Sequence, residues 1–128
     1  MPDFSRSIDV GASPDKTFAF VSDIVNLPRY VPTTRSAEET GIGKVHVVGV
    51  AHGHDYADDG HFYVDAERRL MRWGSGESAY RGELAVSEAP GGSHVAISLH
   101  FHSLSEAAES EIEKSLQTSL ERLRSELG

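Results

Sequence analysis

The sequence predicts an α+β fold in which a curved sheet wraps around a long C-terminal helix. Three observations predict it: a short amphipathic helix near the start, a run of alternating strands through the middle, and one long amphipathic helix at the end. Apolar residues, several of them large aromatics, occupy the side of the strands that we expect to face inward. A sheet curved around a helix can enclose a pocket, so the first functional expectation is the binding of an apolar small molecule.

The N-terminal segment predicts one strand followed by two short helices. Polar and apolar residues alternate over Phe4–Val10, which is typical of a half-buried strand. Ser13 then precedes Pro14, a pair that favours a helix start because Ser caps the first turn and Pro fits within it. Pro28 and Pro32 restrict the following stretch to a short second helical turn.

The middle of the chain predicts several strands separated by glycine-containing turns. Turns are expected at 41–43, 58–60 and 90–92, where Gly occurs alone or with Asp or Pro. The strands expected around these turns cover 44–54, 62–66, 70–74, 80–88 and 94–102.

The C-terminal segment predicts a helix of about twenty residues, which would span roughly 30 Å, the width of a small domain. Ser105 is expected to cap this helix. Its apolar residues recur at helical spacing and form one stripe: Ala108, Ile112, Leu116, Leu120, Leu123 and Leu127. A stripe of this kind indicates that one face of the helix packs against the sheet.

The composition excludes several classes of function. The 128 residues suit a single domain, 1–128, and contain no Cys, so disulfides and cysteine-based zinc sites are excluded. The formal net charge of −8 argues against a nucleic-acid partner, because a phosphate backbone requires a basic surface. No apolar run is long enough to span a membrane, and the N-terminus lacks the pattern of a signal peptide. We therefore expect a cytoplasmic protein.

One segment resembles a known family. The chain reads IDVGASPDKTF over Ile8–Phe18, followed by Val21–Asp23 and Leu27–Pro32, and this stretch resembles the START-like (SRPBCC) superfamily, in particular its bacterial polyketide cyclase/dehydrase-like branch. Asp15 stands where that branch often has Glu, and Tyr30 where it often has Trp. The resemblance extends over nearly the whole chain. Members of the superfamily include polyketide cyclases and aromatases, lipid-transfer domains, and plant hormone or allergen proteins.

The resemblance implies the helix-grip fold: a seven-stranded antiparallel sheet curved around the C-terminal helix, two short helices between strands 1 and 2, and a cavity between sheet and helix. Tyr30, Trp73 and Tyr80 each carry a polar atom that needs a partner when buried, which a ligand or a cavity water could supply. Ordinary core packing would place the same residues inward, so both interpretations stay open. The predicted lining residues are Tyr30, Val45, Val47, Phe62, Val64, Met71, Trp73, Tyr80, Leu84, Ile97, Leu99, Ile112 and Leu116.

The seven histidines raise the question of a metal site. His52 with His54, and His100 with His102, are pairs two residues apart on a strand, so the imidazoles of each pair point the same way. Two imidazoles and a carboxylate such as Asp55 could hold a divalent ion. Both pairs, however, lie on the face opposite the apolar row, on strands that the helix-grip fold does not place side by side. We predict solvated histidines, His61 among them in a surface loop, with no metal and no cofactor.

Three classes of function follow, in order of preference. The first is a module that binds an apolar or aromatic small molecule, lipid-like or polyketide-like. The second is a polyketide cyclase, aromatase or dehydratase without a metal or nucleotide cofactor; Tyr30, Arg72 and Tyr80 are its candidates by residue type, although Arg72 alternates with two inward residues and should face outward. The third is a protein-interaction or stress-regulator module. The chain contains no Gly-x-Ser-x-Gly and no dinucleotide fingerprint, so no residue is assigned a catalytic role.

Overall fold

The structure, a computed structural model, describes residues 3–32, 34–51, 54–75, 80–101 and 106–128, with the backbone alone at 51, 54, 56, 58, 75, 80 and 106–108. Its main element is a seven-stranded antiparallel sheet in the order β1-β7-β6-β5-β4-β3-β2. The strands are β1 (Asp3–Val10), β2 (Thr34–Gly41), β3 (Lys44–Ala51), β4 (His54–Asp65), β5 (Leu70–Ser75), β6 (Tyr80–Ala89) and β7 (Gly92–Phe101). The helices are α1 (Pro14–Ser22), the 3-10 helix η1 (Ile24–Asn26), α2 (Leu27–Tyr30) and α3 (Glu106–Leu127). The predicted helix-grip architecture is confirmed.

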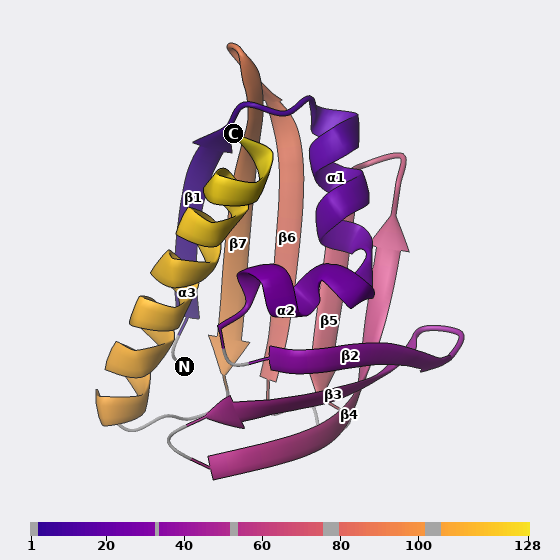
Figure 1. Ribbon diagram of the computed structural model, residues 1–128, viewed down its shortest axis with the longest axis vertical. Coiled ribbons are helices and arrows are strands. Elements are labelled where there is room, and N and C mark those ends of the chain that lie inside the picture. Colours follow the sequence, from indigo (N-terminus) through magenta and orange to yellow (C-terminus); the bar gives the residue numbers. More distant parts are fainter. Residues whose placement is uncertain (1–2, 33, 52–53, 76–79, 102–105) are drawn as a thin grey trace.

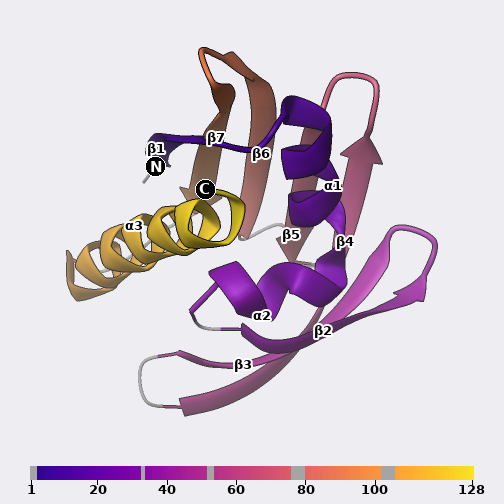
Figure 2. The same cartoon turned by 45° about the horizontal axis from the view of Figure 1, so that its top comes forward.

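The sheet is curved, and the helices cover its concave face. In Figures 1 and 2, β2 and β3 bend away from the plane of β1, β7 and β6, and the long helix α3 lies on the β1 and β7 side. Helix α1 contacts β6 and β7, and helix α2 contacts β2 and α3. The N–H of Gly11 donates to the carbonyl oxygen of Gly128 at 2.6 Å, which joins the end of β1 to the end of α3.

The start of α1 follows from its local sequence. The side chain of Ser13 accepts a hydrogen bond from the backbone N–H of Lys16 at 3.3 Å, and Pro14 occupies the first turn. This cap satisfies one of the amide groups that a helix leaves unpaired at its N-terminus. The prediction of a Ser-Pro helix start is confirmed.

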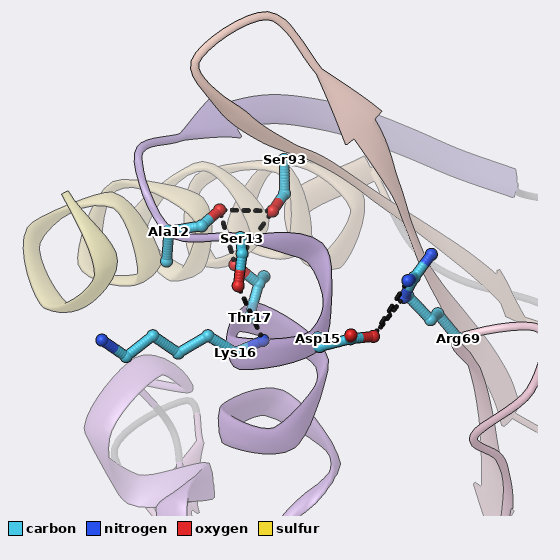
Figure 3. A network of polar contacts seen from close by, with 7 residues as sticks. All are labelled: Ala12, Ser13, Asp15, Lys16, Thr17, Arg69 and Ser93. Atoms are coloured by element: carbon cyan, nitrogen blue, oxygen red, sulfur yellow. Dashed lines mark hydrogen bonds and ion pairs between the residues drawn. The ribbon is translucent and has the colours of Figure 1, made fainter.

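A polar network fastens α1 to the sheet (Figure 3). The hydroxyl oxygens of Thr17 and Ser93 lie 3.1 Å apart, and both side chains are fully buried. Each hydroxyl also lies within hydrogen-bonding distance of the carbonyl oxygen of Ala12, at 3.4 and 2.5 Å respectively. On the other side of the helix, Arg69 contacts the carboxylate of Asp15 through Nε at 3.0 Å and Nη2 at 2.9 Å. Strand β7 and the segments that adjoin β1 and β5 are thereby held to α1 at one end of the molecule, which we call the fastened end.

The core lies between α3 and the concave face of the sheet. Leu116, Leu120 and Leu123 of the predicted stripe are 4%, 1% and 0% exposed, and Ile112 and Leu127 are partly buried against the same cluster. The side chain of Ala108 and the predicted cap Ser105 lie outside the described residues. The other buried members of the cluster come from the sheet and the short helices: Phe4, Val10, Phe18, Val21, Tyr30, Met71, Leu84, Val86, Val95 and Ile97.

Two predictions about the middle of the chain are wrong. The predicted turn at 58–60 lies inside β4, where Asp58 pairs with Val47 and Gly60 with Val45 of β3. His61, predicted in a surface loop, is also in β4. The long antiparallel ladder between β3 and β4 prevails over the local turn preference of the Asp-Asp-Gly sequence, because each paired residue gains inter-strand hydrogen bonds.

Candidate functional site

The concave face carries one row of mostly large side chains that runs across five strands. The strand register places Phe62 opposite Trp73, Trp73 opposite Gly82, Gly82 opposite Leu99, and Leu99 opposite Phe4. Residues paired in this way project from the same face of a sheet. Phe4 is buried, whereas Phe62, Trp73 and Leu99 keep part of their surface exposed. This row is the centre of the candidate site.

Gly82 creates the space in which the indole of Trp73 lies. A Cβ atom added to Gly82 would lie 2.4 Å from Cε2, 2.4 Å from Cζ2 and 2.6 Å from Nε1 of that indole. Carbon atoms in ordinary contact are about 3.5–4.0 Å apart, so any other residue at this position would displace the ring. The indole therefore lies directly over the backbone of β6.

Several apolar side chains at the end of the sheet opposite the fastened end are only partly buried. In the core, Val21, Leu84, Val95 and Leu123 are fully excluded from solvent. Farther along the sheet and α3, the apolar side chains pack against this cluster but remain partly exposed: Trp73, Leu99, Phe101 and Ile112. The four partly exposed residues come from β5, β7 and α3, and we call them the open-end apolar group.

The structure brings together most, but not all, of the predicted lining residues. Tyr30, Met71, Leu84, Ile97 and Leu116 are buried in one cluster, with Trp73, Leu99 and Ile112 packed against it. The remaining described members do not belong to that cluster: Val45 is buried, Val47 and Phe62 are partly buried, and Val64 is 37% exposed. The side chain of Tyr80 lies outside the described residues.

Sequence reasoning missed two aromatic residues at the site. Phe4 and Phe101 meet in an edge-to-face arrangement with ring centroids 6.0 Å apart and an interplanar angle of 80°. Both alternate with polar residues along their strands, so the alternation used for the other strands could have identified them.

The polar groups of two catalytic candidates have partners elsewhere. The hydroxyl of Tyr30 donates to the carbonyl oxygen of Val21 at 2.9 Å in a buried hydrogen bond, and its ring lies 6.1 Å from that of Phe20. Arg72 faces away from the concave side, as its alternation predicted, and its Nε donates to Oε2 of Glu83 at 3.1 Å. The third candidate, Tyr80, has no described side chain.

Three of the described histidines, His46, His94 and His100, form pairs with aspartates on neighbouring strands of the convex face. The Nδ1 atom of His46 lies 2.7 Å from Oδ1 of Asp59, and that of His94 lies 2.7 Å from Oδ1 of Asp9. His100 makes the same contact with Asp3. Within the described ranges, no group of three His, Asp or Glu side chains is arranged to hold a metal ion. The predicted pairs are not fully described, because 52 and 102 lie outside these ranges and only the backbone of His54 lies within them.

Comparison with protein families assigns the chain to a family. Residues 1–128 match the family described as polyketide cyclase/dehydrase and lipid transport, so the chain belongs to this family. No curated protein matches it. Among the described residues, no helix is both long and apolar enough to cross a membrane.

Solved structures show the same fold at low sequence identity. A START superfamily protein from Mycobacterium smegmatis is 12% identical, with a TM-score of 0.82 over 98% of this chain and 96% of its own. The ZhuI aromatase/cyclase from Streptomyces sp. R1128 is 15% identical, with a TM-score of 0.77 over 98% of this chain and 92% of its own. The di-domain aromatase/cyclase BexL from the BE-7585A biosynthetic pathway is 18% identical, with a TM-score of 0.76 over 97% of this chain. This chain spans 45% of the length of BexL.

Proposed function

We propose that the protein binds an apolar or aromatic small molecule, lipid-like or polyketide-like, between the concave face of the sheet and α3. The observation that carries this proposal is the open-end apolar group, in which Trp73, Leu99, Phe101 and Ile112 pack on a tight core yet keep part of their apolar surface exposed. Apolar surface that faces water on the concave side of a sheet gains about 25 cal/mol per Å² when a ligand covers it.

The chemistry of the remaining groups favours binding over catalysis. A cyclase or dehydratase needs an acid or base within reach of its substrate. The Tyr30 hydroxyl is used by the Val21 carbonyl oxygen, and the Arg72 guanidinium is on the convex face beside Glu83. Both residues therefore support the fold rather than offer a proton at the concave face.

Native mass spectrometry of freshly purified protein tests the proposal first. We expect a co-purified apolar molecule, released when the protein is denatured. The second test uses fluorescence, because Trp73 is the single tryptophan of the chain and reports on the site alone. Planar aromatic compounds and fatty acids are titrated separately, and we expect saturable quenching by at least one of these classes.

A matched pair of variants localises the binding. Ile112→Gln places a polar amide in the open-end apolar group and should weaken ligand binding by about tenfold, since unpaired polar groups resist desolvation. Ile42→Gln makes the same change at a side chain that is 100% exposed and should leave binding unchanged. Absence of both a co-purified molecule and any quenching across the panel would refute the proposal, as would equal effects of the two variants.

A further inference from the structure

Four polar side chains are buried among the residues that the structure describes, and only two of them have hydrogen-bond partners there. Thr17 and Ser93 contact each other and the carbonyl oxygen of Ala12 at the fastened end. Thr34 and Ser119 are 8% and 6% exposed, and neither hydroxyl forms a hydrogen bond within the described residues. A buried hydroxyl without a partner costs free energy, and native proteins seldom leave one unpaired. These two positions therefore call for a partner from outside the chain.

Ser119 lies on the same face of α3 as a member of the open-end apolar group. Ile112 precedes it by seven residues, which is close to two helical turns, so the two side chains project in nearly the same direction, roughly 10 Å apart along the axis. Glu126 follows Ser119 by the same interval and contacts Arg29 of α2 at 3.8 Å. Of the two hydroxyls, that of Ser119 is thus the one that shares a helix face with the proposed ligand site.

Burial along this face of α3 decreases from Ser119 towards the open end. Ser115 lies about one turn before Ser119 and is partly buried, and Ile112, about one turn further on, is partly buried as well. The buried hydroxyl therefore borders a partly exposed stretch of the same helix face. A molecule that covers Ile112 and extends along α3 towards α2 reaches Ser119 next.

The surroundings of Ser119 favour an uncharged group. In the part of the chain that the structure describes, no ionisable side chain is buried. The ion pair on this face, between Arg29 and Glu126, has side chains that are 61% and 36% exposed. A carboxylate beside Ser119 would lose its hydration without gaining a buried cation, which is costly. A ketone or hydroxyl oxygen is cheaper to bury, and the Ser119 hydroxyl can donate to either one.

We propose that the ligand of the concave site is an uncharged molecule with a ketone or hydroxyl oxygen at its inner end. This oxygen forms a hydrogen bond with the hydroxyl of Ser119, and the apolar body of the ligand covers Ile112. Ser119 thereby selects an oxygen-bearing ligand over a pure hydrocarbon and over a fatty acid. The inference rests on the proposed function and narrows the class of ligand that the site takes.

Calorimetric titration with three naphthalenes of similar shape tests the inference. The first, 2-acetylnaphthalene, carries a ketone; 2-isopropylnaphthalene has a methyl group in place of the ketone oxygen; and 2-naphthoate is charged. We expect the ketone to bind most tightly. Ser119→Ala should lower the ratio of the ketone affinity to the hydrocarbon affinity by about tenfold, because the ketone loses its partner. Ser125→Ala changes an exposed serine of the same helix and, as the matched control, should keep the wild-type ratio.

Urea unfolding of the ligand-free protein separates a role in binding from a role in the fold. Ser119→Ala removes a buried hydroxyl that has no described partner and introduces a better helix former, so the unfolding midpoint should not fall.

Three results would overturn the inference and leave the proposed function standing, provided that the hydrocarbon still binds. They are a lower unfolding midpoint in Ser119→Ala, an unchanged affinity ratio in that variant, as expected for a hydroxyl bonded to a trapped water, and binding of 2-naphthoate as tight as that of the ketone. If none of the three compounds binds, the inference and the proposed function both fail.

Discussion

The contact between Gly82 and Trp73 allows a quantitative prediction. In the variant Gly82→Ala, the new methyl carbon would lie 2.4 Å from two carbons of the Trp73 indole. Ordinary carbon contacts are about 3.5 Å or longer, so the ring must move by about 1 Å or the strand must give way. The ring is the more mobile of the two, because β6 is held by hydrogen-bonded ladders to β5 and β7.

The expected loss of stability combines two opposing effects. Overpacking a folded core by one methyl group costs about 1–3 kcal/mol. Replacing Gly by Ala restricts the unfolded chain and contributes about 0.4–1 kcal/mol in the other direction. The free energy of unfolding should therefore fall by about 1–2 kcal/mol. The wavelength of Trp73 emission should shift as well, because the displaced indole meets a different environment.

The assay is urea unfolding followed by far-UV circular dichroism, with the emission spectrum of the folded protein recorded in parallel. Gly41→Ala serves as the control, since a Cβ there would meet Lys44 Cδ at an ordinary 3.6 Å, and its stability should change by less than about 0.5 kcal/mol. Combining Gly82→Ala with Trp73→Phe should recover part of the loss, because residues in contact give non-additive changes. A Gly82→Ala protein with unchanged stability and unchanged emission would refute the reasoning.

Three further variants test other parts of the structure by the same unfolding assay. Ser93→Ala leaves the buried hydroxyl of Thr17 without one of its neighbours and should cost about 1–2 kcal/mol; an unchanged midpoint would show that the network is not stabilising. Leu123→Ala empties a fully buried position on α3 and should cost about 2–5 kcal/mol, whereas a cost below 1 kcal/mol would mean that α3 is not part of the core. Tyr30→Phe removes the donor to the Val21 carbonyl and should cost about 1 kcal/mol with ligand affinity retained; lost affinity at wild-type stability would assign the hydroxyl to the ligand instead.

Local signals predicted the elements whose stability is local. The Ser13-Pro14 start of α1 was readable because a cap involves residues three positions apart, here Ser13 and Lys16. The stripe of α3 was readable because helical spacing alone places Leu116, Leu120 and Leu123 on one face. Alternation likewise identified the inward side of β5 and β7.

The sequence predicted poorly those elements that depend on pairing with distant segments. Thr34–Gly41 has no apolar alternation, and it forms β2 through its pairing with β3. The Asp-Asp-Gly sequence at 58–60 has turn chemistry but lies in β4 for the same reason. In both cases the hydrogen bonds that decide the structure join segments whose pairing cannot be read from either segment alone.

At the candidate site, too, the local sequence predicts some features and contacts between distant segments determine the others. Val64 and Met71 are opposite each other on neighbouring strands and project from the same face, yet Val64 is 37% exposed and Met71 is 4% exposed. Alternation assigns both residues to the inward side. Which of them is buried depends on whether another helix or strand packs over its side chain. The same holds for Tyr30, whose hydroxyl was expected to need a partner and finds one in its own helical region at Val21.

The sequence by itself determined the class of the fold, the residues on the inward side of most strands, and the apolar face of the long helix, since each of these depends on spacing within one segment. Only the tertiary structure decided which inward residues are buried and which remain partly exposed. Which residues cover one another depends on register: Phe4 lies opposite Leu99 because hydrogen bonds align β1 with β7, which is far away in the chain. The folded structure determines which residues are neighbours across the sheet, and it therefore also determines the shape of a site.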